Sequence, residues 1–443
     1  MQQQQQIIHQ ASPKSSYSRQ RFEPPKPEKP FPPSGNIVVS IPRTDAGQTA
    51  LDHLRENSAT DLGCAFLGTL TDLLIDYGVK NRSYADELPY MFALLSCAGG
   101  DEISVINRIL RFHCAHEEAQ PPHGRVEAAE TNATLSLYAH EFGKATIGLP
   151  FDLHSPNSMH DSYMTLLKVQ DAHNQQIEGH GVRIAVIDSG TDNSSPFVQQ
   201  FSDMYETTNT SPVDNVGHGT AMSAIIHEIV PQAEVISIRI ADLSPSLINT
   251  MAGVCKALYD YKVDIMNLSL GFSATGLKCK RCNRSAESSS LVFEKFLWSQ
   301  LQLEPSLPAP IYVTSTGNDG RNTFNQPAAY DSTLAVGSIN HHLTRSSFSN
   351  YGAAQGQFLV MPGGDYDEAN QSVIEWAGEG SNEKCLGTSA SAAYASGILG
   401  LYKSAPKFQG LTRQAFLQSI AAKCRPVPSH NVIEHGQGYL PYH

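Results

Sequence analysis

The stretch GHGVRIAVIDSG, residues 179–190, decides the fold class. Its centre, VRIAVI at 182–187, is a short apolar run rich in β-branched residues. Such a run is typical of a strand buried on both faces. It is followed by Asp188, Ser189 and Gly190. An acid at this place either caps the next turn or serves a functional site, because α/β proteins place functional groups at the carboxyl ends of parallel strands.

Four later segments repeat the apolar, strand-like pattern, and helical patterns fill the gaps between them. The segments are EVISIRI at 234–240, VDIMNLSL at 263–270, PIYVTSTG at 310–317 and STLAVGSI at 332–339. An amphipathic helix is expected at 163–176, ahead of the first strand. Alternating strands and helices predict parallel βαβ units. We therefore expect an α/β domain with a mostly parallel central sheet over residues 151–443.

Composition and charge exclude several classes of function. The 443 residues include 31 basic and 43 acidic side chains, for a net charge of −12. This balance argues against binding to nucleic acid or to an anionic membrane, which both need clustered basic residues. No stretch approaches the roughly 20 apolar residues of a membrane span. The start, MQQQQQIIHQ, lacks a basic segment followed by an apolar core, so we expect no signal peptide and a cytoplasmic protein.

The dispersed cysteines fit that expectation. The eight cysteines are spread through a long chain. Without a secretory signal, we expect reduced thiols rather than a disulfide framework. The pair Cys279 and Cys282 forms a single CxxC, which is weak evidence for zinc without a second pair. It lies in an insertion, residues 273–290, that we expect to be a basic surface loop or an exosite near the substrate.

The chain before residue 151 divides into three segments by composition. Residues 1–44 contain a glutamine run and the Pro-rich EPPKPEKPFPP, and we expect a disordered tail there. Residues 45–118 show three- and four-residue apolar spacings that predict a small all-α bundle. Residues 119–150 are expected to be a linker with one short helix near 130–143.

Three polar residues beyond Asp188 stand in contexts that suit catalysis. His218 lies in VGHGTAMSAII, between two glycines that allow close backbone approach. Asn318 follows an apolar strand in TSTGNDG, and Ser389 lies at a predicted helix start in GTSASAAYASGIL. Each has a structural alternative: a buried histidine, an ordinary turn and a plain helix cap.

Taken together, these residues supply the parts of a serine hydrolase. A serine nucleophile needs a base, an acid that orients the base, and donors for the oxyanion. The motifs IAVIDSG, GHGT and GTSAS, in that order, resemble those of the subtilisin-like serine proteases, or subtilases. NLSLG at 267–271 resembles the substrate-binding strand of that family. The resemblance covers about 163–403 and implies a three-layer subtilisin-like fold, with Gln326–Pro327 as a cis peptide bond.

The resemblance also assigns a role to each residue. Ser389 would attack the scissile carbonyl, His218 would accept and return the proton, and Asp188 would orient His218. The Asn318 side chain and the Ser389 N–H would stabilise the oxyanion. A protein or peptide substrate would lie extended along the cleft and add a strand by main-chain hydrogen bonds. The substrate-binding residues implied are Ser269, Leu270, Gly271, Ser315, Thr316 and Gly317.

Several positions depart from the family pattern. Ala390 and Ala393 stand where many relatives have Met and Pro, and Tyr394 follows. The loop that binds calcium in many subtilases is missing after His218, so we expect no cofactor and no strong metal site. The acidic run GGDYDEAN at 363–370 is a weak cation candidate or a solvated loop. Asp319 could favour a basic P1 residue or be an exposed turn acid.

The N-terminal region suggests regulation. Secreted subtilases commonly carry an α+β inhibitory propeptide, whereas residues 45–118 look all-helical. We therefore expect an intracellular serine endopeptidase regulated through this helical module, which would bind a protein partner, self-associate or assist folding. The alternative function is a catalytically silent adaptor that uses the protease fold as a scaffold.

Overall fold

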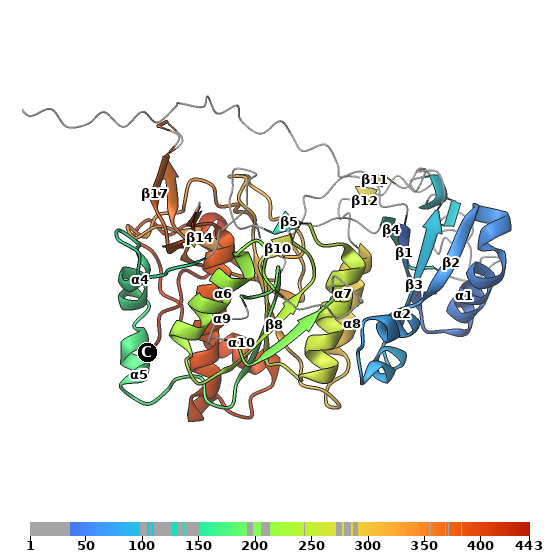
Figure 1. Cartoon of the computed structure of the whole chain (residues 1–443), viewed down its shortest axis with the longest axis horizontal. Coiled ribbons are helices and arrows are strands. Elements are labelled where there is room, and N and C mark those ends of the chain that lie inside the picture. Colours follow the sequence, from blue (N-terminus) through green and yellow to red (C-terminus); the bar gives the residue numbers. More distant parts are fainter. Residues whose placement is uncertain are drawn as a thin grey trace, which may run out of the picture.

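The structure is a computed structural model of the whole chain (Figure 1). It describes two units, an N-terminal α+β unit and a larger α/β unit that carries the residues proposed for catalysis. The described residues are 36–97, 104–106, 108–109, 126–131, 136–137, 150–192, 198–204, 213–242, 244–271, 277–278, 285–286, 291–353, 356–367, 369–370, 372–381 and 383–443.

A parallel sheet of seven strands forms the centre of the larger unit, in the order β15-β14-β13-β9-β6-β8-β7. Every neighbouring pair in it is parallel. The α/β fold expected from the sequence is confirmed, and so are all five predicted strands. The strands are β6 (Arg183–Asp188), β7 (Gln200–Asp203), β8 (Glu234–Arg239), β9 (Ile265–Leu268), β13 (Ile311–Ser315), β14 (Thr333–Ile339) and β15 (Gln357–Pro362).

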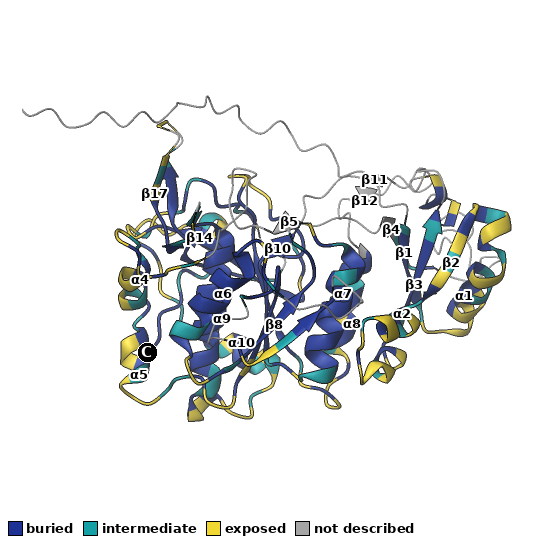
Figure 2. Ribbon diagram, viewed as in Figure 1, coloured by how far each residue is buried: buried dark blue, intermediate teal, exposed yellow. Residues whose placement is uncertain are grey.

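Helices cover both faces of this sheet, so its strands are apolar on both sides (Figure 2). Ile184 and Val186 of β6 pack in the cluster formed with the helices of one face. Ala185 and Ile187 pack in the cluster formed with those of the other. The first face carries α4 (His160–Leu166), α5 (Val169–His173), α6 (His218–Ile229), α9 (Thr388–Ser404) and α10 (Arg413–Ala421), and the second carries α7 (Leu247–Cys255) and α8 (Leu291–Leu301).

Smaller elements complete the larger unit. Gln326–Pro327 is cis, as the family resemblance implied. The helix expected at 163–176 is divided into α4 and α5 at Lys168, which has a φ of 56°. The remaining elements are β10 (Leu270–Gly271), β11 (Leu277–Lys278), β12 (Ser285–Ala286), β16 (Asp365–Asp367), β17 (Ser372–Glu375), β18 (Gly378–Glu379), β19 (Lys384–Cys385) and α11 (Val432–His435).

The N-terminal unit is a four-stranded antiparallel sheet with helices, and the expected all-α bundle is wrong. The sheet order is β2-β3-β1-β4. The first strand begins inside the segment expected to be a disordered tail, and the fourth lies in the expected linker. The elements are β1 (Asn36–Pro42), α1 (Asp45–Asn57), β2 (Cys64–Thr69), α2 (Leu70–Asp76), β3 (Tyr90–Cys97) and β4 (Ala128–Thr131).

The wrong prediction has a physical reason in β1 and β3. Both strands are covered on both faces, so their apolar runs lose the alternation that marks an ordinary antiparallel strand. In β3, Met91 and Leu95 pack in the cluster that includes α1 residues, whereas Phe92 and Leu94 pack in the cluster that includes α7 and α8 residues. The sheet of the N-terminal unit therefore lies against α7 and α8 of the larger unit (Figure 1).

A disulfide joins two strands of the N-terminal unit, contrary to the expected reduced thiols. Cys64 in β2 is paired directly with Cys97 in β3, with a Cα–Cα distance of 4.4 Å. Cys279 and Cys282 lie outside the described residues. Among the helices of the described residues, none combines the length and the apolar character needed to cross a bilayer.

Candidate active site

Asp188 and His218 form the centre of the candidate site. Asp188 ends β6 at the carboxyl edge of the sheet, and His218 is the first residue of α6. Both are fully buried, and the His218 Nδ1 to Asp188 Oδ1 distance is 2.6 Å. A carboxylate offers only acceptors, so Nδ1 is the donor and a neutral His218 keeps its lone pair on Nε2. Nε2 is buried without a hydrogen-bond partner among the described residues.

A buried acid missed by the sequence analysis holds the histidine loop. The Asp214 carboxylate accepts hydrogen bonds from the N–H groups of Val216, Gly217 and Thr220 at 2.8–2.9 Å. It also accepts from the hydroxyl of Ser189, the residue after Asp188, at 2.9 Å. Burial raises the pKa of Asp214, although these donors oppose the shift. Its only sequence signal is its position four residues before His218.

Gly219 allows α6 to approach the end of β6. A Cβ atom at this position would lie 2.0 Å from the carbonyl oxygen of Gly190. The Gly219 N–H donates to the Ser189 hydroxyl at 2.9 Å. The glycine after the histidine is therefore required by the short distance between the helix start and the loop that follows Asp188.

Ser389 lies in the first turn of α9, beside the segment that follows β9. Its Oγ is 3.4 Å from the Ser269 carbonyl oxygen, and the Ser269 Oγ donates to the Ser389 carbonyl at 3.2 Å. Asn267, which is fully buried, donates to the Ser269 Oγ at 2.9 Å and accepts from Ser396 of α9 at 3.1 Å. These bonds tie the serine helix to the predicted substrate strand.

Asn318 is held next to Ser389 by Thr388. The Thr388 N–H and hydroxyl both donate to the Asn318 Oδ1, at 2.9 and 2.8 Å. The Thr388 hydroxyl also accepts from the Gly317 N–H at 3.2 Å. With Oδ1 bound to Thr388, the orientation of the Asn318 amide is set. Thr388 was not singled out from the sequence, because its contact with Asn318 spans 70 residues of chain.

The residues predicted for the site lie at the carboxyl edge of the sheet, although no hydrogen bond joins His218 Nε2 to the Ser389 hydroxyl. The strands β6, β9 and β13 are adjacent there, so the segments that follow them converge. Thr316 and Gly317 follow β13, and the loop after them is bound to the segment that precedes β15. The predicted residues that the structure brings to this edge are Asp188, His218, Ser269, Leu270, Gly271, Ser315, Thr316, Gly317, Asn318 and Ser389.

The chain itself occupies the edge of the predicted substrate strand. Leu270 and Gly271 of β10 pair antiparallel with Leu137 and Ser136 of β5 (Ser136–Leu137). This segment lies in the expected linker and follows the N-terminal unit. Ser389 is fully buried, like His218 and Asp188. The three candidate catalytic side chains are therefore closed to solvent.

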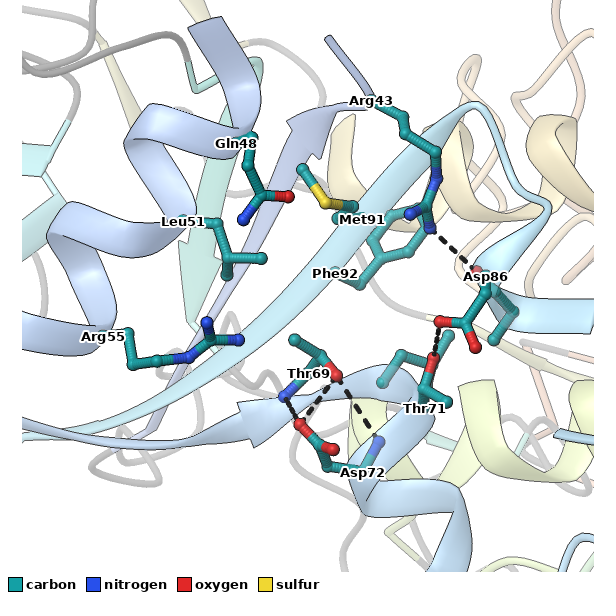
Figure 3. A pocket seen from close by; sticks show the side chains of 12 residues that line it. Arg43, Gln48, Leu51, Arg55, Thr69, Thr71, Asp72, Asp86, Met91 and Phe92 are labelled. Atoms are coloured by element: carbon teal, nitrogen blue, oxygen red, sulfur yellow. Dashed lines mark hydrogen bonds between the residues drawn. The ribbon is translucent and has the colours of Figure 1, made fainter. Parts of the chain in front are cut away.

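A cavity of about 360 Å³ lies elsewhere, within the N-terminal unit between α1 and β3 (Figure 3). The side chains of Arg43 and Arg55 line it from opposite sides. Arg43 donates to the Leu88 carbonyl at 2.8 Å, and Asp72 accepts from the Thr69 hydroxyl at 2.8 Å. All residues that line the cavity belong to the N-terminal unit, so the cavity is separate from the candidate active site.

The unusual residue Tyr394 is accommodated within a continuous α9. It is fully buried, and its hydroxyl lies 2.6 Å from Nδ1 of His160 on α4. Its ring packs edge-on against Tyr163, with 5.6 Å between the ring centroids. The departure from the family pattern thus anchors α4 to the serine helix.

His160 should make the stability of the protein depend on pH. Burial and the neighbouring His154 lower the pKa of His160 from 6.5 to about 4, with Asp161 opposing them. The folded state therefore binds fewer protons than the unfolded state between these pH values. We expect stability to be constant above pH 6.5 and to fall by about 3 kcal/mol as pH drops to 4.

Urea unfolding at several pH values checks this prediction. His160→Gln should unfold with a much smaller loss of stability between pH 6.5 and 4, because the amide does not titrate. The control is His154→Gln, which removes the neighbouring half-exposed histidine and should retain most of the loss. An unchanged pH dependence in His160→Gln would contradict the assignment.

Comparisons with known proteins agree with the geometry. A thermostable alkaline protease from Halalkalibacterium halodurans is 26% identical over 200 residues, which are 43% of this chain and 50% of that protein. Subtilisin Savinase from Lederbergia lenta is 26% identical over 202 residues, 43% of this chain and 67% of its own. Subtilisin E from Bacillus subtilis is 28% identical over 231 residues, 46% and 55% of the two chains. The chain thus spans about half to two thirds of the length of these relatives.

The family comparison covers a larger part of the chain. The sequence pattern of the subtilase family matches residues 179–439. This range contains every strand of the central parallel sheet and all residues predicted for the site. It covers more than half of the chain, which belongs to the subtilase family, the serine peptidases of the S8 class.

Proposed function

We propose that the chain is a serine endopeptidase that uses Ser389, His218 and Asp188 as its catalytic triad. The observation that carries the proposal is the 2.6 Å bond between Asp188 and His218 Nδ1, which leaves Nε2 as the basic atom. Ser389 lies in the first turn of α9, where the backbone N–H groups have no acceptor within the helix and the helix dipole favours negative charge. The proposed substrate is a protein or peptide bound along β10.

The reaction would follow the order of events that these positions allow. His218 Nε2 takes the proton of the Ser389 hydroxyl as the oxygen attacks the peptide carbonyl. Asp188 stabilises the imidazolium that forms. The Asn318 side-chain amide and the Ser389 N–H donate to the oxyanion of the tetrahedral intermediate. His218 then returns the proton to the leaving amine, and water hydrolyses the acyl-enzyme.

A fluorophosphonate probe tests the proposal directly, because it reacts with an activated serine. We expect the wild-type chain to be labelled and Ser389→Ala not to be. Ser419→Ala removes a serine hydroxyl of α10 that donates to the Ala415 carbonyl of the same helix, and it serves as a control, which should still be labelled. Equal labelling of wild type and Ser389→Ala would disprove the assignment, and no labelling of Ser389 even in the Asp260→Ala background described below would favour the catalytically silent adaptor.

We further propose that the N-terminal unit inhibits the enzyme in the full chain. This replaces the helical module expected from the sequence. Three observations support it: the α+β architecture of the unit, the pairing of β5 with the substrate strand, and the complete burial of the triad. An extended segment on β10 takes the place of a substrate strand.

The interface between the two units has an apolar part and a polar part. Phe92 of β3 packs edge-on against Phe296 of α8, with ring centroids 5.5 Å apart. Tyr77 donates from its hydroxyl to Asn249 of α7 at 2.7 Å. The turn at 78–81 of the N-terminal unit is bound by Lys256 and Asp260, which belong to the helical turn after α7. These contacts supply the affinity that an inhibitory segment needs.

Asp260 is the main polar contact of this interface. It accepts hydrogen bonds from the N–H groups of Lys80 and Asn81 at about 3.0 Å, and from Lys256 Nζ at 2.8 Å. Lys256 also donates to the Gly78 carbonyl at 2.9 Å. Burial opposes the ionisation of Asp260, but the Lys256 ammonium and the two N–H groups outweigh it and lower the pKa.

Asp260→Ala should therefore open the full chain. Loss of the Asp260 carboxylate leaves the N–H groups of Lys80 and Asn81 without this acceptor and removes the partner charge of Lys256. Binding of the N-terminal unit is therefore weakened. We expect fluorophosphonate labelling of Ser389 to become about 10-fold faster.

The matched control is Asp264→Ala. Asp264 accepts from the Arg183 N–H at 3.0 Å and pairs with Lys403 at 3.4 Å, contacts that lie within the larger unit. This variant should label at the wild-type rate. Equal rates for Asp260→Ala and wild type would contradict the inhibitory role of this contact.

A further inference from the structure

We propose that Asn350 is a positioning residue that sets the direction of the Asn318 amide, which rests on the catalytic role proposed for Asn318. Asn350 lies between β14 and β15 and is fully buried. Its side chain binds the loop at 316–321, which carries Asn318 at its centre.

Both ends of the Asn350 side-chain amide are used in this loop. Oδ1 accepts from the N–H groups of Asp319 and Arg321, each at 3.0 Å. Nδ2 donates to the Thr316 carbonyl and to the Asp319 carboxylate, each at 3.2 Å. Two donors and two acceptors are the full capacity of a primary amide. The bonds fall on both sides of Asn318, so the loop cannot rotate about one anchor.

The main chain of Asn350 adds a second set of contacts. Its N–H donates to the Gly317 carbonyl at 2.9 Å, and its carbonyl accepts from the Thr316 hydroxyl at 3.1 Å. Gly317 has a φ of 106°, and a Cβ there would lie 2.5 Å from Asn350 Nδ2. The loop can therefore close on Asn350 only with glycine directly before Asn318.

The second support for Asn318 comes from the serine helix. Thr388 binds the Asn318 Oδ1 from one side, and Asn350 holds the loop backbone from the other. Because an oxyanion donor is effective only within a few tenths of an ångström of its position, a loosened loop loses transition-state stabilisation without losing substrate binding.

Asp319 also takes part in this arrangement. Its carboxylate accepts from Asn325 Nδ2 at 3.0 Å as well as from Asn350. It therefore helps to hold the loop, and its exposed position agrees with the alternative of an exposed turn acid. The Asp319 carboxylate thus joins the side chains of Asn325 and Asn350 next to Asn318.

The test is a double-mutant cycle on the full-length protein. Turnover is measured with a peptide substrate and divided by the number of Ser389 sites that a fluorophosphonate labels to completion. Asn350→Ala should lower kcat about 10- to 100-fold with little change in KM. In the Asn318→Ala background, the same substitution should lower kcat less than about 3-fold, because the donor that it positions is already gone.

Asn340→Ala is the matched control. Asn340 is also a buried asparagine, and its amide binds the turn at 342–344 and Asp365 outside the loop of Asn318. It should leave kcat per labelled site unchanged. If Asn350→Ala does not fold, Asn350→Ser replaces it and should show an intermediate loss of kcat.

Each outcome has a definite meaning. A loss of kcat that is equal in the wild-type and Asn318→Ala backgrounds would overturn the positioning role, and so would an unchanged kcat. A chain in which Ser389 is not labelled even with Asp260→Ala would instead reject the proposed protease function. The two failures are therefore distinguishable.

Discussion

Replacing His218 with alanine should lower kcat by on the order of 10⁶, the loss that the same change causes in subtilisin, a member of this family. The reason is that Nε2 of His218 is the proposed base that activates Ser389, and its lone pair depends on the Nδ1 bond to Asp188. KM should change little, because His218 does not hold the substrate strand. Initial rates at several concentrations of a peptide substrate give kcat and KM, and thermal unfolding of the same samples shows whether the variant is folded.

Asp188→Asn should cause a smaller loss of kcat than His218→Ala. The amide would donate to Nδ1 and force the proton to Nε2, so the imidazole could no longer act as the base; a loss of about 10⁴ is expected. Both variants should also be measured in the Asp260→Ala background, to separate chemistry from access to the site. A His218→Ala variant that keeps more than a hundredth of the wild-type kcat would show that another group is the base.

The sequence predicted the parts of the candidate site that depend on local pattern. One buried strand, rich in β-branched residues, ends in Asp188, and another is followed by Asn318. In a parallel sheet the carboxyl ends of the strands lie at the same edge, so these two residues were expected to lie near each other. A histidine and a serine at helix starts add the remaining groups. Their order along the chain carried the family resemblance, which the comparison over residues 179–439 supports.

The supporting residues could not be predicted in this way. Asp214, Thr388 and Asn350 act through hydrogen bonds to loops, and their partners are 2 to 71 residues away in the sequence. Neither hydropathy nor periodicity contains information on such contacts. These contacts depend on how the loops pack together at one edge of the sheet.

The N-terminal unit shows the limit of periodicity itself. β3 reads YMFALLSC, an apolar run that suits a buried helix as well as a buried strand. Its strand conformation is decided by tertiary packing, with α1 on one face and with α7 and α8 on the other. The sequence of the run alone does not show that α7 and α8 cover one of its faces, because these helices belong to the larger unit.

Gly219→Ala should reduce kcat by about 10²-fold or more, although the substitution adds one methyl group. That methyl would lie 2.0 Å from the Gly190 carbonyl oxygen, a backbone atom that has no rotamer with which to withdraw. The first turn of α6 must then move away from the end of β6. His218 is the first residue of this turn, so its 2.6 Å bond to Asp188 lengthens. A displacement of about 1 Å at a catalytic group is known to cost about 10²-fold.

The control for this prediction is Gly397→Ala on α9, where an added Cβ would lie 2.7 Å from the Ile229 side chain. Overpacking at either site should lower stability by about 1–3 kcal/mol. Only Gly219→Ala should also lower kcat per labelled Ser389, since Ile229 lies at the opposite end of α6 from His218. Equal kcat values for the two variants would show that the close approach of α6 to Gly190 serves packing alone, and that the position of His218 tolerates a shift of its helix.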